Sequence, residues 1–295
     1  MEYMLKTNFK NFPKEKNFST ILRDFLGKGI FNVHVDTWRF QKKMASLHLN
    51  NHSLVTSLAV KIINKHAHPL LQKNNALGVM LDLQDVFQRF SFDNIYRFSF
   101  GLDPDCLTRQ SGFTPVFVKN FDLTLKLFAE RATTGSPFVW KLKRLLNLGS
   151  RKQLKKAVRV INVLVREVIQ QRCKKGFSKN KDLLSSFLLA GRDTVASALT
   201  SFFLYYREAP EVESKIHVLY INRVIGHNKD LTSFQELKQL HYLQVVAHKS
   251  MRLFPPIQFD SKFCLEDNEL PNGDKVESGT KVTYHPYAMG RLEEI

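Results

Sequence analysis

The sequence predicts a mainly α-helical protein with a few short strands near its C-terminus. Long segments repeat apolar residues at helical spacing, and residues that start or stop helices bound several of these segments. Patterns typical of strands are confined to the part of the chain beyond Ile257. The chain has 295 residues, of which 43% are hydrophobic and 12% aromatic, and this composition indicates a globular protein with a large core.

Seven segments are predicted to be helical, and residues at their ends support the assignment. Asp36 is expected to cap the first segment, and Asp93 is expected to divide the second into two short helices. The last segment is expected to end at Pro255 and Pro256. The segments cover, in chain order, residues 36–47, 79–100, 118–131, 151–172, 186–204, 210–226 and 233–254.

Two short strands are expected after the last helix. The segments IQFDSKF and KVTYHPY begin at Ile257 and Lys281. A Pro271-Asn272-Gly273 sequence typical of a turn separates them. No internal repeat or low-complexity tract interrupts this pattern.

The segment 151–172 is the clearest amphipathic helix in the sequence. Its basic residues lie away from its apolar stripe, so a helix on a membrane surface or on nucleic acid is one interpretation. The pattern favours the other interpretation, in which the stripe packs on a core and the charges face water. The stripe consists of Leu154, Val158, Ile161, Val165 and Val168, and the basic residues are Lys155, Lys156, Arg159 and Arg166.

The chain is strongly basic, with 44 Lys and Arg against 27 Asp and Glu and a formal net charge of +17. This charge suits an acidic protein, an anionic membrane face or nucleic acid, unless it is only a solvated surface. The three cysteines lie far apart, which excludes a disulfide framework and a zinc motif and fits a reducing compartment. Charges interrupt the first 31 residues, so a soluble or peripheral protein is expected.

The predicted helix 186–204 contains polar and small residues in an apolar setting. Ala190 and Gly191 are small, Asp193 is charged, and the hydroxyl of Thr194 can donate to the carbonyl of Ala190. Such a bond bends a helix and opens a groove in which a flat group can approach the backbone. The pattern therefore predicts either a buried cofactor beside a proton path or a core helix with one glycine and a paired acid.

Three motifs resemble those of the cytochrome P-450 monooxygenases. AGRDT resembles the family's oxygen-activating helix, KSMRLFPP the helix that carries Glu-x-x-Arg, and WRFQK the helix that carries Trp-x-x-x-Arg. The motifs occur in the family's order, and the resemblance covers essentially the whole chain. The segments FLLAGRDTVASALTSFF, SMRLFPPIQFDSKFC and VTYHPYAMGR resemble the plant branch that hydroxylates fatty acids and fatty-acid-derived signals.

The resemblance implies one partial domain over residues 1–295, incomplete at both ends, with the mostly helical fold of that family. It implies heme b with a cysteine thiolate as axial ligand, which favours splitting of dioxygen. NADPH-cytochrome P-450 reductase would supply electrons, and one oxygen atom would enter a C–H bond of a lipophilic substrate. The family works at the cytosolic face of the endoplasmic reticulum membrane, and no nucleic acid is expected as a partner.

The resemblance also assigns roles to individual residues. Thr194 would hydrogen-bond the oxygen being activated, and Asp193 would help to relay protons. Phe259 and Asp260 would border the substrate, as would Ala190. Trp38, Lys42 and Lys262 would face a heme propionate. The complete set assigned to the cofactor is Trp38, Lys42, Ala190, Gly191, Arg252 and Lys262.

Several positions depart from the family's pattern. Lys249 stands where the family has the Glu of Glu-x-x-Arg, and Lys42 stands where it has Arg. The like charges of Lys249 and Arg252 would cost roughly 0.2–0.5 kcal/mol in water. In a buried site, loss of the anion that pairs with Arg252 would cost about 3–5 kcal/mol. The cysteines of the chain are Cys106, Cys173 and Cys264, and none of them lies in the family's Phe-x-x-Gly-x-Arg-x-Cys-x-Gly loop. No metal ligand is therefore assigned.

Two further segments are missing from the expected pattern. The join at residues 183–187 lacks a helix and loop that the family has there, and the N-terminal membrane anchor is absent. The sequence therefore predicts a truncated or degenerate member of the family that is inactive as written. The alternatives are a non-catalytic remnant that binds lipid or reductase, and a basic nucleic-acid-binding helical protein.

Overall fold

The computed structural model describes residues 1–14, 22–33, 35–49, 52–101, 103–108, 113–133, 150–173, 181–216, 218 and 234–293. The chain divides into two compact units. Unit 1 comprises residues 1–45, 110–187 and 261–282, and unit 2 comprises residues 46–109, 188–260 and 283–295. That the whole chain forms one partial domain stays a prediction.

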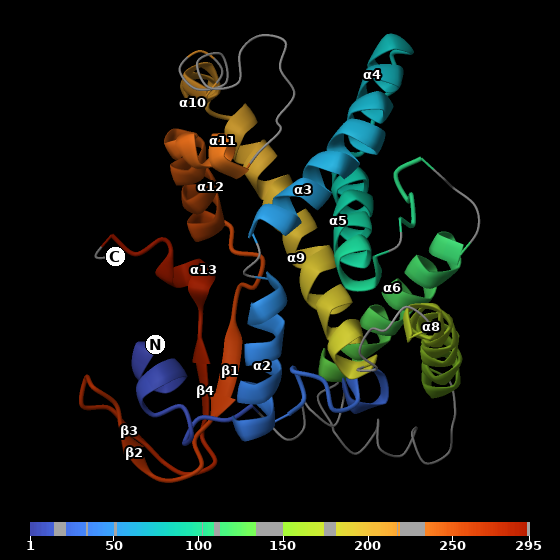
Figure 1. Ribbon diagram of the computed structural model, residues 1–295. Helices are drawn as coiled ribbons and strands as arrows, with labels where there is room; N and C mark the ends of the chain where they lie inside the picture. The colour runs from blue at the N-terminus through green and yellow to red at the C-terminus, as the bar shows by residue number, and fades with distance from the viewer. Residues whose placement is uncertain are drawn as a thin grey trace. The chain divides into compact units, whose positions relative to one another are not determined.

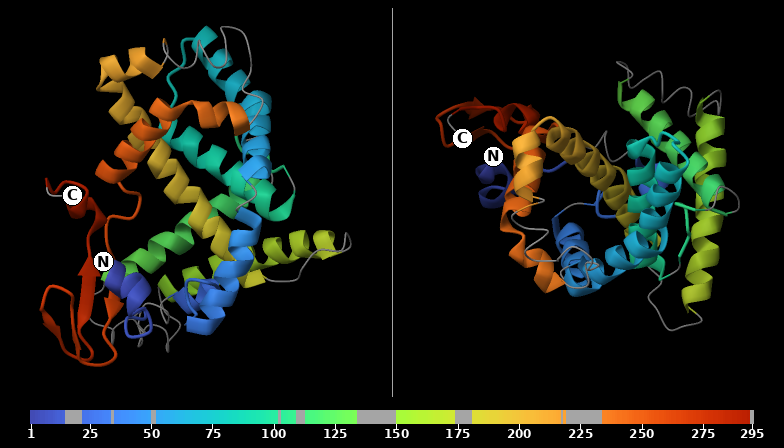
Figure 2. Two further views of the ribbon diagram at one scale, coloured as in Figure 1. Left: turned by 60° about the vertical axis from the view of Figure 1, so that its left-hand side comes forward. Right: turned by 90° about the horizontal axis from the view of Figure 1, so that it is seen from above.

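Helices make up most of both units, which confirms the mainly α-helical prediction (Figures 1 and 2). Within the described ranges, no helix has both the length and the apolar character needed to cross a membrane. The helices are η1 (Tyr3–Thr7), α2 (Val35–Leu49), α3 (His52–Ile62), η2 (Ile63–Ala67), α4 (His68–Ala76), α5 (Leu83–Phe100), α6 (Phe113–Thr133), α8 (Ser150–Cys173), α9 (Lys181–Arg207), α10 (Pro210–Lys215), α11 (Phe234–Gln239), α12 (His241–Leu253) and α13 (Pro286–Met289).

Helix α5 passes through Asp93 without a break, so the prediction of two short helices is wrong. The helix begins at the N-cap Asp82, which accepts two backbone N–H groups, and ends at Gly101 with φ of 67°. Asp93 is fully buried, and its carboxylate accepts the backbone N–H groups of Cys106 at 3.0 Å and Leu107 at 3.3 Å. These bonds satisfy the acid inside the helix, which the sequence pattern could not show.

Two other helix ends differ from the prediction. Asp36 lies inside the first turn of α2 and is not its N-cap; its carboxylate lies 3.6 Å from Arg39. The segment predicted as one helix up to residue 254 forms α11 and α12, which are separated at the buried Leu240 with ψ of 56°. The predicted end before Pro255 is confirmed, whereas the ends predicted at residues 226 and 233 lie outside the described residues.

The core of unit 1 lies between α6 and α8, which are in contact and lie next to each other in Figure 1. Four members of the predicted apolar stripe of α8 are buried, with Leu154, Ile161 and Val165 each at most 2% exposed and Val158 at 8%, whereas the side chain of Val168 lies outside the described residues. Aromatic rings of α6 and of the N-terminal segment pack nearby, with 5.6 Å between the ring centroids of Phe25 and Phe121. The interpretation of α8 as a helix packed on a core is therefore confirmed.

An acidic side chain joins three parts of unit 1. The Oδ2 atom of Asp24 accepts a hydrogen bond from Arg131 of α6 at 3.4 Å and another from Arg151 of α8. The three side chains are 19%, 8% and 17% exposed. Asp24 thus carries the negative charge that two largely buried guanidinium groups face.

In unit 2, α3 packs beside α5, and a buried cluster of Ile62, Val86 and Leu107 lies at their contact. The loop after α5 is tied to this cluster by the buried His66. The two ring nitrogens of His66 lie 3.3 Å from Asp103 and 2.9 Å from Asp105. Polar contacts with His66 therefore hold the loop whose backbone N–H groups donate to Asp93.

Both predicted strands are present, and a second strand pair was missed. Strands β1 (Asp260–Phe263) and β4 (Lys281–Tyr284) form one two-stranded sheet. Strands β2 (Asn268–Glu269) and β3 (Lys275–Val276) form an antiparallel hairpin. The predicted turn closes this hairpin, with Gly273 at φ of 87°, a backbone conformation that favours glycine.

Candidate functional site

The central part of α9 carries the hydroxyl that the sequence singled out. Thr194 Oγ1 donates a hydrogen bond to the carbonyl oxygen of Ala190, which confirms the predicted backbone contact. Ala190 is exposed, and Thr194 is partly exposed. The bond directs the hydroxyl along one face of α9, next to a small residue.

Gly191 lies on another side of α9 and faces α5. A Cβ atom built on Gly191 would lie 2.8 Å from side-chain atoms of Ile95, closer than real Cβ atoms approach such groups. Glycine therefore permits α9 and α5 to come this close within unit 2. Gly191 thus has a packing role in the described structure, and its assignment to a cofactor stays a prediction.

An apolar pocket of about 490 Å³ lies between α9 and α12 in unit 2. We call it the α9–α12 pocket. Thr194 is the one residue with a hydroxyl group among those that line it, and the others are apolar. The pocket can therefore hold a lipophilic group beside a single hydrogen-bonding side chain. The lining residues are Thr194, Val195, Ala198, Leu199, Phe202, Leu243, Ala247, Met251 and Pro256.

Asp193 precedes Thr194 in α9 and remains in contact with water. Its side chain is 40% exposed, and its Oδ1 atom lies 3.6 Å from the guanidinium of the buried Arg192. A carboxylate that is open to water on one side can exchange protons with the solvent. This position suits the predicted relay, which stays a prediction.

Trp38 and Lys42 share one face of α2 in unit 1, as their spacing predicts. Lys42 Nζ lies 4.7 Å from the centroid of the Trp38 ring, which is a cation–π contact. The Trp38 ring in turn lies 5.1 Å from the ring of Phe9. Lys262 of β1 is also in unit 1 and is buried. Contact of these residues with a propionate stays a prediction.

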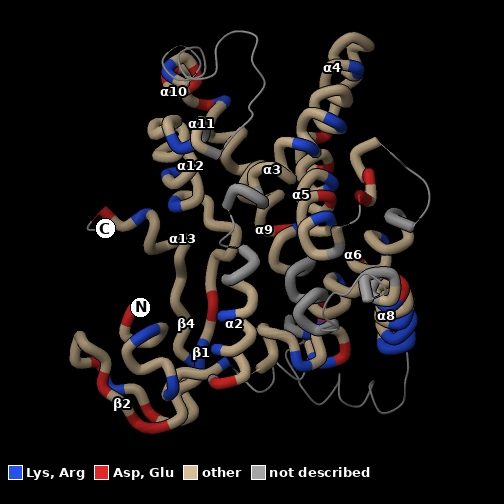
Figure 3. The backbone as a smooth tube through the Cα atoms, viewed as in Figure 1, with Lys and Arg blue, Asp and Glu red and all other residues tan. Residues whose placement is uncertain are grey.

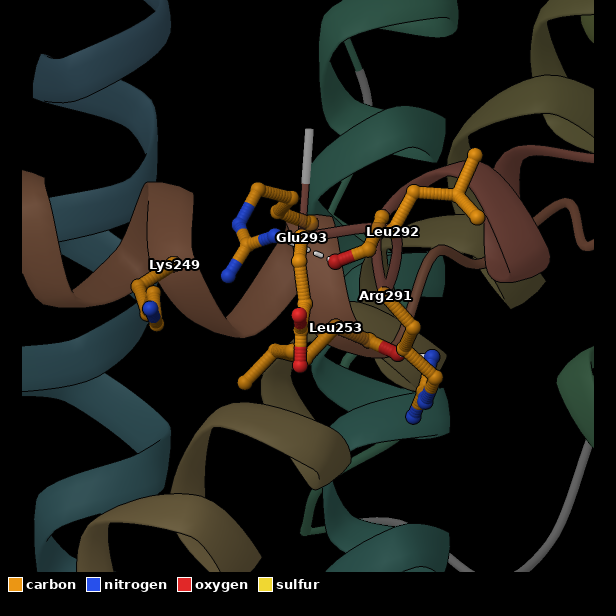
Figure 4. A pocket seen from close by; sticks show the side chains of 7 residues that line it. Lys249, Leu253, Arg291, Leu292 and Glu293 are labelled. Atoms are coloured by element: carbon orange, nitrogen blue, oxygen red, sulfur yellow. Dashed lines mark hydrogen bonds between the residues drawn. The ribbon is translucent and has the colours of Figure 1, made fainter. Parts of the chain in front are cut away.

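Arg252 lies in unit 2, at a second pocket of about 550 Å³ (Figure 4). Arg252 donates to the carbonyl oxygen of Gly290. Arg291 donates to the carbonyl of Leu253 and stacks on Tyr287, with 3.6 Å from its guanidinium carbon to the ring centroid. Backbone carbonyls thus accept from both arginines where α12 ends. The pocket is lined by Lys249, Arg252, Leu253, Gly290, Arg291, Leu292 and Glu293.

Substituting Lys249 by glutamate should raise the free energy of unfolding by only about 0.5–1 kcal/mol. Lys249 and Arg252 are both exposed, so the change replaces one solvent-screened repulsion by an attraction of similar size. Urea denaturation measures the gain, and Lys249→Gln should give about half of it. A gain of about 3 kcal/mol or more would contradict this prediction, because it would require a buried pair.

The strand pair β1–β4 brings Asp260 to a tyrosine that the sequence did not single out. The hydroxyl of Tyr284 donates to Asp260 Oδ2 at 3.0 Å. Burial and the negative charge of Asp260 raise the pKa of Tyr284 to about 12, so the phenol keeps its proton. Phe259 is 60% exposed, and its ring lies 5.9 Å from that of His285. The only sequence signal for Tyr284 was its place in a predicted strand.

The cysteines of the described chain do not provide a ready thiolate. Cys106 and Cys264 are both buried. The thiol of Cys106 bonds to the Asp93 carboxylate, and that of Cys264 lies 2.9 Å from the carbonyl oxygen of Glu266. Burial raises the pKa of Cys264, and an axial ligand must be deprotonated. These two residues therefore do not fit the axial position of a heme, and the side chain of Cys173 lies outside the described residues.

Known proteins resemble this chain along its whole length. A family model described as cytochrome P-450 matches residues 2–189 and 177–295. Cytochrome P-450 94C1 of Arabidopsis thaliana is 46% identical over 321 residues, covering 100% of the chain and 64% of that relative. Cytochrome P-450 94B3 of Arabidopsis thaliana is 38% identical, and cytochrome P-450 94A1 of Vicia sativa is 33% identical. Both cover 100% of the chain, which spans 62% and 61% of their lengths.

The comparisons also bear on the tight join at residues 183–187. The two family matches overlap over residues 177–189, which include this join. The alignment with cytochrome P-450 94C1 extends over 321 residues, so that relative has residues within the matched region that this 295-residue chain lacks. Helix α9 continues without a break from Lys181 across the join. A deletion at the join stays a prediction, whereas the match along the whole chain shows that the chain belongs to the cytochrome P-450 family.

Proposed function

We propose that this chain is the part of a heme-dependent monooxygenase that handles oxygen and a lipophilic substrate. The observation that carries the proposal is the hydroxyl of Thr194 on the wall of the apolar α9–α12 pocket. We further propose fatty acids or fatty-acid-derived signals as substrates, because the motif segments resemble the plant branch with that activity. Electrons would come from NADPH-cytochrome P-450 reductase at the cytosolic face of the endoplasmic reticulum membrane.

In this proposal the chain's own residues bind and orient the substrate, and they move protons. A bound heme b supplies the activation of dioxygen. The apolar lining of the α9–α12 pocket holds the hydrocarbon part of the substrate and keeps water away from it. The hydroxyl of Thr194, directed by the carbonyl of Ala190, offers a hydrogen bond at the pocket wall, and Asp193 exchanges protons with water.

We propose that the chain by itself does not catalyse this reaction. The support is the burial of Cys106 and Cys264, the bond of the Cys106 thiol to the Asp93 carboxylate, and the raised pKa of the Cys264 thiol, so that neither residue fits an axial thiolate. The test is a heme titration of the purified chain, followed by reduction under carbon monoxide. The expected result is no red-shifted Soret band of a thiolate-bound heme; its appearance would overturn the claim of inactivity.

The apolar pocket also favours a second candidate function, a non-catalytic protein that binds lipid. In that case the chain holds a long acyl group in the α9–α12 pocket without turnover. Displacement of a fluorescent fatty acid by palmitate would measure such binding directly. Absence of saturable binding, together with no capture of the reductase, would remove the support for this candidate.

Replacing Ala198 by aspartate should weaken fatty-acid binding at least tenfold. Ala198 lines the α9–α12 pocket, and a carboxylate there must lose its water when an acyl chain enters. Thr194→Val is the matched control, since it keeps the shape of the pocket wall, and binding should stay within about twofold. The displacement assay reads both variants. Equal binding by the Ala198→Asp variant and the wild type would place the acyl chain elsewhere.

A further inference from the structure

The pocket of about 550 Å³ at the end of α12 is basic, and the proposed function does not use it. We call it the α12–α13 pocket. Among the described residues that line it, three are cations and one is an acid, which gives the lining a net charge of two positive units. Basic residues recur along α12 and follow α13 in Figure 3. The cations are Lys249, Arg252 and Arg291, and the acid is Glu293.

A tight junction between α12 and the segment after α13 builds this pocket within unit 2. Gly290 is buried, and a Cβ atom built on it would overlap the carbonyl oxygen of Arg252. Glycine therefore lets this segment come close to the end of α12, where Arg252 donates to the carbonyl oxygen of Gly290. These contacts hold the backbone that carries the cations before any ligand binds.

The guanidinium of Arg291 is positioned without a carboxylate. Its Nη1 atom donates to the carbonyl oxygen of Leu253 and, at 3.1 Å, to that of Tyr287. The guanidinium carbon also lies 3.6 Å from the centroid of the Tyr287 ring and 5.2 Å from that of Phe254. The donors on Nε and Nη2 remain for an oxyanion. A side chain held in this way loses little conformational entropy when it binds a ligand.

No ion pair neutralises the three cations within the described part of unit 2. Lys249 and Arg252 lie one turn apart on α12, and the sequence of this helix contains no acidic residue. Lys249 takes the place of the glutamate that the family's pattern puts there. In the view of Figure 4, Glu293 lies between Lys249 and Arg291, but it forms no ion pair with a described residue. The pocket therefore has a positive potential that attracts an anion.

We propose that the α12–α13 pocket binds the phosphate group of a small organic phosphate monoester. Such a group carries about −1.5 to −2 charges at neutral pH, which matches the net charge of the lining. Its terminal oxygens can accept from the ammonium of Lys249 and from both guanidinium groups. Leu253 and Leu292 add apolar surface for the organic part, and the volume suits a small molecule.

Isothermal titration calorimetry of the full chain with phenyl phosphate, at constant ionic strength, tests this inference without heme. Wild type should bind phenyl phosphate saturably. It should bind inorganic phosphate about tenfold more weakly, because the phenyl ring contacts the two leucines. Methyl phenyl phosphate is a diester with a single charge, like the phosphates of nucleic acids and lipids. It should bind about tenfold more weakly than phenyl phosphate.

Three variants identify the residues that bind the phosphate. Lys249→Glu should weaken binding of phenyl phosphate about a hundredfold, since it removes a cation and adds a repelling carboxylate. Glu293→Gln should strengthen binding about threefold, because it removes the acid from the lining. The matched control is Lys73→Glu, which makes the same change of charge at an exposed lysine of α4 in unit 2, outside the pocket. It should bind like the wild type.

Urea denaturation verifies that the variants fold. Absence of saturable binding by the wild type would overturn the inference. Equal loss in Lys249→Glu and Lys73→Glu would also overturn it, because net charge alone would then explain binding. So would equal affinity for the monoester and the diester, since the pocket would then not select a doubly charged phosphate.

Discussion

Replacement of Asp24 by alanine should lower the free energy of unfolding by about 3 kcal/mol. The change removes the carboxylate that accepts from Arg131 and Arg151, whose side chains are only 8% and 17% exposed. Two largely buried guanidinium groups would then lose the carboxylate that accepts from both, which is far costlier than the loss of an exposed pair. Chemical denaturation monitored by circular dichroism measures the effect.

The control for this experiment is Asp36→Ala on α2. Asp36 also faces an arginine, Arg39 at 3.6 Å, but its side chain is 93% exposed. Exposed ion pairs contribute little to stability, so this variant should unfold like the wild type. If Asp24→Ala were no more harmful than Asp36→Ala, the proposed burial of the Asp24 site would be wrong.

Asp93→Ala should destabilise unit 2 by about 2–4 kcal/mol. The two carboxylate oxygens accept the N–H groups of Cys106 and Leu107 in the interior, and alanine would leave both donors buried without an acceptor. An asparagine side chain keeps one acceptor oxygen, so Asp93→Asn should cost about half as much. Hydrogen exchange of these two amides gives a local measurement. Unchanged exchange in the alanine variant would contradict the role given to Asp93.

The same residue gives a pH dependence of defined sign. Burial raises the pKa of Asp93 above its ordinary value of 3.8, although the bonds from Cys106 and Leu107 oppose the shift. The folded state therefore takes up this proton at a higher pH than the unfolded chain does. Between the raised value and about 3.8, the wild type should gain stability relative to Asp93→Asn as the pH falls. A relative loss of stability in that range would refute the shift.

Sequence periodicity predicted the long helices well where one face is apolar and the opposite face charged. Helix α8 was expected over residues 151–172 and spans Ser150–Cys173, because its apolar stripe has a single helical period. Prediction failed where distant groups decide the local structure. A buried acid looked like a break in α5, since the N–H groups that it accepts, at Cys106 and Leu107, belong to a loop beyond the helix.

In the candidate site, too, the sequence predicts contacts within one helix but not contacts between separate elements. The bond from Thr194 to Ala190 could be predicted because it joins residues one helical turn apart. The contacts of Gly191 with Ile95 and of Tyr284 with Asp260 could not, because they depend on how separate elements pack. The sequence also left open whether Lys249 and Arg252 lie in a buried or an exposed site. Both residues are exposed, so the small cost of like charges in water applies.

The contact between Gly191 and Ile95 changes what a retained motif says about a protein's history. A gene copy that has lost its chemistry but still yields folded protein keeps a packing constraint at position 191, since a Cβ atom there would lie 2.8 Å from side-chain atoms of Ile95 and would force that side chain to shift. Thr194, which faces the pocket, has no such constraint from a neighbouring helix. Related chains in which Thr194 is replaced while Gly191 is retained would therefore be chains that selection keeps for their fold and no longer for their catalytic activity.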